Sequence, residues 1–144
     1  LEKQLKRTIP DVYKEFLTKC SNGLSFMVSR LDLHGIRTSN ADRSDFSLRF
    51  PFGIQNVEVD GRPENATDNM FFFGTYGYDC SKLYLDRSDN KVYYCARYDA
   101  TPLKSWNSFS EMLRSEIERI YGLFDDNGHE IDKSVPTIPV VPSK

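Results

Sequence analysis

The sequence offers few of the residues that usually carry chemistry. It contains only two histidines, His34 and His129, and they stand far apart in the chain. No cysteine or histidine accompanies either of them at a spacing typical of a zinc site. Glycine-rich phosphate-binding loops and the nucleophile elbow of hydrolases are also missing. We therefore expect no metal, no cofactor and no catalytic residue.

Long apolar runs and an excess of positive charge are absent as well. The longest cluster of bulky apolar residues is Met70–Phe73, whereas a membrane-spanning helix needs about 20 such residues. Lysine and arginine number 19 against 21 aspartates and glutamates, which gives a formal net charge of −2. Proteins that bind nucleic acid by neutralising phosphates normally carry a basic excess. The sequence thus predicts neither a membrane nor a nucleic acid as a direct partner.

Cysteines are few, and their number is odd: Cys20, Cys80 and Cys95. A chain of 144 residues can bury a core without covalent staples, so disulfides are not needed to explain its stability. An odd number of thiols is typical of a reducing compartment. We therefore predict a cytoplasmic protein with three free, non-catalytic thiols.

The apolar content and its spacing along the chain predict a folded protein with one hydrophobic core. Hydrophobic residues make up 39% and aromatic residues 13% of the chain, too much for a disordered protein. A first helix is expected to start at Pro10, which suits the first helical position, and to stop at Asn22-Gly23. The spacing predicts one buried stripe along this helix, formed by Tyr13, Phe16, Leu17 and Cys20.

The clearest strand signal is a hairpin formed by Lys82–Asp86 and Lys91–Tyr98. With Asp86 opposite Lys91, the core face of this hairpin carries the pairs Leu85–Val92 and Leu83–Tyr94. The same register predicts that Tyr84 and Tyr93 face each other on the solvent side. The preceding segment, Met70–Phe73, is typical of a strand buried on both faces.

A last helix is predicted to begin at a capping box, Ser108-Phe109-Ser110-Glu111, and to end before Gly122. We predict an α+β fold in a single domain, with a mostly antiparallel sheet packed by N-terminal and C-terminal helices. Residues 1–124 form this domain, and the proline-rich residues 125–144 form a strap or tail. The predicted core consists of Tyr13, Phe16, Leu17, Phe73, Leu83, Leu85, Val92, Tyr94, Phe109, Leu113 and Ile117.

Two surfaces are candidates for binding a protein partner. The first is the solvent side of the hairpin, with Tyr84, Asp86, Tyr93 and Arg97, because aromatic residues and arginine are enriched at interface hot spots. A helix or the strap could instead cover these tyrosines. The second is an acidic stretch that would attract a basic partner, represented by Glu116, Glu118, Asp125 and Asp126. Asp79, Asp86, Asp89 and Asp99 around the hairpin leave a hydrolytic or ligand-binding role open.

Several short motifs follow one another in a recognisable order. They are Leu5–Leu17, Asn22-Gly23, where Leu24 stands in place of a second glycine, and Phe73-Gly74, followed by the hairpin strands, Trp106 and the start of the last helix as far as Leu113. This order resembles the SUKH superfamily of immunity proteins and Smi/Knr-type cell-wall regulators. The resemblance implies a non-catalytic protein that binds a cognate bacterial toxin, often a nuclease, and neutralises it by stoichiometric occlusion. A small hydrolase or ligand-binding domain that uses the hairpin carboxylates remains the alternative.

Overall fold

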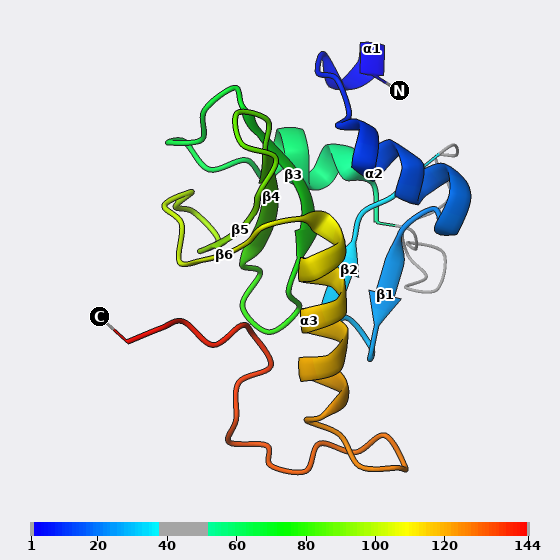
Figure 1. Ribbon diagram of the computed structural model, residues 1–144, viewed down its shortest axis with the longest axis vertical. Coiled ribbons are helices and arrows are strands. Elements are labelled where there is room, and N and C mark those ends of the chain that lie inside the picture. The colour runs from blue at the N-terminus through cyan, green and yellow to red at the C-terminus, as the bar shows by residue number, and fades with distance from the viewer. Residues whose placement is uncertain (1, 38–51, 144) are drawn as a thin grey trace.

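The computed structural model describes residues 2–37 and 52–143 of the chain (Figure 1). Its helical elements are α1 (Glu2–Leu5), α2 (Asp11–Glu15), the π-helical turns η1 (Phe16–Cys20) and η3 (Asn56–Asp60), and α3 (Phe109–Tyr121). Its strands are β1 (Leu24–Phe26), β2 (Leu31–Leu33), β3 (Met70–Thr75), β4 (Lys82–Asp86), β5 (Val92–Cys95) and β6 (Lys104–Trp106).

The six strands form one antiparallel sheet in which spatial order follows sequence order, from β1 to β6. The predicted hairpin register is confirmed, with the pairs Leu83–Tyr94, Tyr84–Tyr93 and Leu85–Val92. The α+β class, the antiparallel sheet and the packing helices are confirmed with it. The capping box is present too, because Ser108 Oγ accepts a hydrogen bond of 3.1 Å from the Glu111 N–H.

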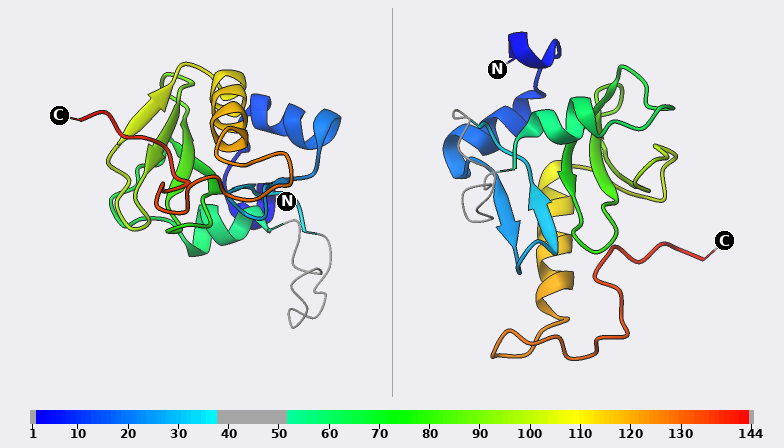
Figure 2. Two further views of the ribbon diagram at one scale, coloured as in Figure 1. Left: turned by 90° about the horizontal axis from the view of Figure 1, so that it is seen from below. Right: turned by 180° about the vertical axis from the view of Figure 1, so that it is seen from behind.

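Both faces of the sheet are covered. Viewed from below, α2 and α3 lie on one side of the strands and η3 lies on the other (Figure 2). The larger core lies under α2 and α3, and a smaller core lies under η3. The smaller core consists of Val57, Phe72, Tyr84, Cys95 and Ala100.

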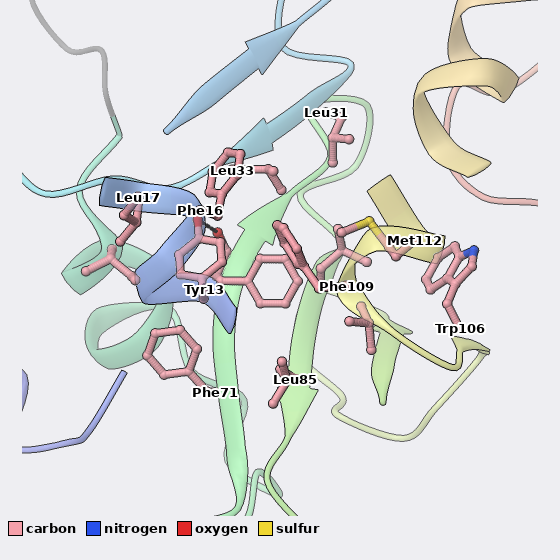
Figure 3. Close-up of a cluster of buried hydrophobic side chains, with 14 of the residues drawn as sticks. Tyr13, Phe16, Leu17, Leu31, Leu33, Phe71, Leu85, Trp106, Phe109 and Met112 are labelled. Atoms are coloured by element: carbon pink, nitrogen blue, oxygen red, sulfur yellow. Dashed lines mark hydrogen bonds between the residues drawn. The ribbon is translucent and has the colours of Figure 1, made fainter. Parts of the chain in front are cut away.

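Tyr13 stands at the centre of the larger core and is fully buried (Figure 3). Its ring centroid lies 4.9 Å from that of Phe73 and 5.6 Å from that of Phe109, so this ring joins α2 to β3 and α3. The Tyr13 hydroxyl donates a hydrogen bond of 2.5 Å to the carbonyl oxygen of His34. The same side chain therefore contributes apolar packing and satisfies a buried backbone acceptor.

Most of the predicted core is confirmed, but three residues are more exposed than expected. Leu113 and Ile117 are only half-buried, and Cys20 is exposed. The last turn of the first helix is a π-helical turn, in which the Ser21 N–H bonds to the Phe16 carbonyl five residues back. This wider turn changes the phase of the helix and removes Cys20 from the buried stripe that an α-helical period predicts.

Beyond α3 the chain forms a loop below the helix, closed by an antiparallel bridge between Phe124 and Glu130, and then returns toward the sheet before its last residues lead outward (Figure 1). Arg30 Nε donates to Glu130 Oε1 over 3.1 Å, and Arg119 Nη2 donates to the Thr137 carbonyl over 2.9 Å. Thr137 and Pro139 are buried. Within the described residues, no helix is both long and apolar enough to cross a membrane.

Candidate functional site

Tyr84, the first residue predicted for partner binding, does not lie on the solvent side of the hairpin. It is 1% exposed, and its hydroxyl donates to the Ala100 carbonyl over 3.1 Å. The prediction of an exposed Tyr84 is therefore wrong. The residues that cover it come from the smaller core, including Val57 of η3, and not from the last helix or the strap. The strand alternation itself is correct, but residues distant in sequence bury both faces.

Tyr93 is held rigidly at the margin of that smaller core. Its ring stacks on the Tyr84 ring with centroids 5.3 Å apart and planes inclined by 22°. Its hydroxyl donates to Asp89 Oδ2 over 2.6 Å. This hydrogen bond lowers the pKa of Asp89 and raises the pKa of Tyr93 to about 12. Tyr93 is half-buried, so part of the fixed ring remains accessible.

Asp86 and Arg97 stand at opposite ends of the hairpin. Asp86 is half-buried and stabilises the β4–β5 turn, where its Oδ1 accepts from the Ser88 N–H over 2.8 Å. Arg97 is exposed beyond the far end of β5, with its guanidinium carbon 4.9 Å from the Tyr98 ring centroid. The four predicted hairpin residues therefore do not form one continuous exposed patch.

The carboxylates around the hairpin are engaged in turns. Each accepts a hydrogen bond from the backbone N–H two residues further on, in the pairs Asp79–Ser81, Asp86–Ser88, Asp89–Lys91 and Asp99–Thr101. Such bonds are typical of aspartates that shape turns. In the part of the chain that the structure describes, no group of three His, Cys, Asp or Glu side chains is arranged to hold a metal ion.

The acidic surface is only partly as predicted. Glu118, Asp125 and Asp126 are exposed, but Glu116 is fully buried, so the prediction that Glu116 faces solvent is wrong. Glu116 Oε2 accepts a hydrogen bond of 2.9 Å from the Tyr76 hydroxyl. The sequence contains a signal for this burial, because Glu116 lies four residues after Met112 and four residues before Ile120. It therefore continues the buried stripe of α3.

A second buried acid, Glu58 on η3, was not singled out by the sequence. Its Oε2 accepts from the Phe72 N–H over 2.7 Å and pairs with Arg62 Nη1 at 3.1 Å. Its Oε1 lies 3.3 Å from Arg7 Nε. Burial raises the pKa of Glu58, while these partners oppose the rise. Glu58 thus joins the N-terminal segment, η3 and β3, which gives it a structural role.

The sequence also did not reveal two concave regions beside α2. One is a cleft of about 920 Å³ beside the N-terminal segment, lined by charged residues that include Arg7, Asp68 and Arg87. These side chains already interact with one another. The Arg7 guanidinium forms an ion pair of 3.1 Å with the Asp68 carboxylate, and Arg87 Nη1 donates a hydrogen bond to the Asp68 carbonyl. Arg7, Asp68 and Arg87 are therefore already paired within this chain.

The second concave region is an apolar groove between α2–η1 and α3, with a volume of about 510 Å³. Phe16, Phe109, Leu113 and Ile117 line it, and Val12 at its margin is 39% exposed. The half-buried state of Leu113 and Ile117 is explained by this groove. We call it the helix groove.

The three thiols differ in their access to solvent. Cys20 and Cys80 are exposed, Cys95 is buried, and none of them forms a disulfide. Burial raises the pKa of Cys95 to about 12, which suppresses the reactive thiolate. In dilute native protein, we expect a colorimetric thiol reagent to modify Cys20 and Cys80 quickly and Cys95 only after unfolding. Rapid modification of all three thiols would contradict the buried position of Cys95.

The profile of the SMI1/KNR4 family (SUKH-1) matches residues 1–115. This chain belongs to the SMI1/KNR4 family. No curated protein and no solved structure matches it significantly. The SMI1/KNR4 match covers all six strands and ends within α3. The resemblance of the short motifs is thereby confirmed, and a role in protein binding is consistent with this SUKH family.

Proposed function

We propose that this SMI1/KNR4 protein is an immunity protein that binds a cognate protein toxin stoichiometrically and neutralises it by occlusion. The observation that supports this function is the family match over most of the chain. In this proposal the toxin is a nuclease or a similar effector, and the complex forms in the cytoplasm of the cell that is protected. No catalytic group of this protein takes part.

The geometry of Tyr93 supports a binding role for the hairpin end. Its ring is fixed by the stack on Tyr84 and by the bond to Asp89. An aromatic side chain that is already immobile loses little conformational entropy on binding, which favours affinity. Asp86 and Arg97 are charged residues on the same hairpin, and we assign them to partner selection rather than to affinity.

The alternative of a small hydrolase is less well supported. Asp89 and Asp99 both have pKa values lowered by hydrogen bonds, chiefly from the Tyr93 hydroxyl and from Thr101. A general acid at neutral pH needs the opposite shift, because it must keep its proton near pH 7. Asp89 and Asp99 are therefore suited to holding turns and not to acid catalysis.

The first test is neutralisation of the toxin encoded beside this protein. We expect a titration to end at one immunity protein per toxin, with tight binding by calorimetry. Tyr93→Ala is expected to weaken binding by about tenfold, or about 1.4 kcal/mol. Tyr78→Ala is the matched control, since Tyr78 is also an exposed tyrosine but lies in the β3–β4 turn.

The rival acidic surface is tested separately by reversing Asp125 and Asp126 to lysine. If this surface attracts a basic toxin, association becomes slower in the reversed variant and in wild type at high salt. If neither the Tyr93 change nor this reversal weakens binding, both assigned surfaces are wrong. If the neighbouring toxin is neither bound nor inhibited, the proposed function itself is wrong.

A further inference from the structure

The outer face of α3 carries a stripe that has no partner within the described chain. Ser110, Arg114, Ile117 and Tyr121 recur at intervals of four, three and four residues, so they lie along one side of the helix. Tyr121 is 66% exposed although it is one of the largest side chains on the helix. Ile117 is half-buried and also lines the helix groove. This stripe is distinct from the hairpin surface assigned to the toxin.

The helix groove runs beside most of the stripe, since its lining on α3 extends from Phe109 to Glu118. Tyr121, which is 66% exposed, lies one turn beyond Ile117 and outside this lining. A two-fold rotation that reverses the direction of α3 places the Tyr121 ring of each copy over the groove of the other.

One charged residue within the stripe and one beside it are unpaired within the described residues. Arg114 and Glu118 are exposed and lie one turn apart on α3, and both line the groove. Neither forms an ion pair or a side-chain hydrogen bond with any other described residue. On the opposite margin, Glu15 is already paired with Lys19 at 2.8 Å. The unpaired charges are therefore confined to α3.

We propose that a second copy of this chain docks on the helix groove, with the two α3 helices antiparallel about a two-fold axis near Glu116. Because an α-helix rises about 1.5 Å per residue, this axis sets Arg114 of each copy level with Glu118 of the other. Ile117 then lies close to its own counterpart. Tyr121 of each copy lies over the Ser110 end of the groove in the other. The result is a symmetric dimer with two equivalent ion pairs around an apolar centre.

The experiment is sedimentation equilibrium of the purified chain across the micromolar range. Wild type is expected to reach twice the 16.7 kDa mass of the chain. Arg114→Glu and Glu118→Arg each turn two attractive contacts into two repulsive ones, so each variant alone should dimerise roughly tenfold more weakly. Mixed together, the two variants should form a heterodimer nearly as stable as the wild-type dimer, since both contacts become attractive again.

The mixture is the decisive measurement. If Arg114 and Glu118 only supported the fold of their own chain, mixing the two variants would not restore dimerisation. Arg97→Glu is the control, since it reverses an exposed charge that does not line the helix groove and should leave dimerisation unchanged. Ile117→Glu should abolish the dimer while thermal melting still shows a folded chain. A monomer at all concentrations, or a dimer that these variants leave intact, would overturn the proposal. Either outcome leaves toxin neutralisation, which is measured through Tyr93, unaffected.

Discussion

Replacing Tyr13 with alanine is expected to reduce the free energy of unfolding by about 3–5 kcal/mol. The side chain is fully buried, and its ring contacts Phe16, Phe71, Phe73 and Phe109. Alanine would leave a cavity where α2, β3 and α3 meet, and rigid aromatic neighbours on all sides cannot collapse into it. Urea denaturation monitored by circular dichroism measures the loss as a lower midpoint at an unchanged slope.

Tyr13→Phe separates the packing of this ring from its hydrogen bond. Phenylalanine keeps the ring contacts but removes the donor to the His34 carbonyl, which costs about 1 kcal/mol for a typical hydrogen bond. The alanine variant should therefore be far less stable than the phenylalanine variant. Equal losses for the two would show that the ring contacts contribute little and that the bond dominates.

The second large effect is a loss of stability in acid that depends on His34. Burial lowers the pKa of His34 from 6.5 to about 4. Its Nδ1 lies 3.2 Å from the Gly53 carbonyl, which can only accept, so Nδ1 carries the proton. Nε2 then accepts from the Thr75 hydroxyl at 3.0 Å. The neutral ring is therefore fully satisfied in the fold, and the protonated ring is not.

Stability falls in acid because the unfolded chain binds a proton at His34 at a higher pH than the folded protein does. As the pH falls below 6.5 the unfolded chain protonates at His34, whereas the folded protein does so only near pH 4. Stability is therefore complete above pH 6.5 and is lost between pH 6.5 and 4. The expected loss from this residue is about 3 kcal/mol.

Denaturation series at several pH values, on wild type and His34→Gln, isolate this contribution from that of the carboxylates. Glutamine cannot become charged, so the variant should lose less stability than wild type between pH 6.5 and 4. His129→Gln is the matched control, because the His129 side chain is 80% exposed and its replacement should preserve the wild-type profile. A parallel profile for wild type and His34→Gln would contradict the assigned role of His34.

Both faces of the sheet are covered by other parts of this SMI1/KNR4 protein. Tyr13 and its neighbours fill one face, and the smaller core under η3 fills the other. The two surfaces that we propose for partners lie at the margin of the smaller core, at Tyr93, and on the outer side of α3, at Tyr121. Because these two surfaces lie on different elements, the proposed toxin and the proposed second copy would not compete for the same residues.

Local patterns in the sequence determined the elements that depend on neighbours in the chain. The capping box at Ser108 fixed the start of α3, and the alternation on each side of Asp86 and Lys91 fixed the register of the hairpin. The apolar run Met70–Phe73 predicted a strand buried on both faces, and Phe71, Phe72 and Phe73 are fully buried. Capping and periodicity act over one or two turns, so the sequence displays them directly.

Only the tertiary structure decided which of those faces meet water. Tyr84 has a solvent-side position by alternation, yet η3 and Ala100 bury it from distant parts of the chain. Glu116 is charged, yet Tyr76 and Arg119 supply the partners that allow its burial. The helix groove likewise exists only because α2 and α3, nearly a hundred residues apart, pack on one face of the sheet. Burial depends on such long-range contacts, whose partners no local pattern identifies.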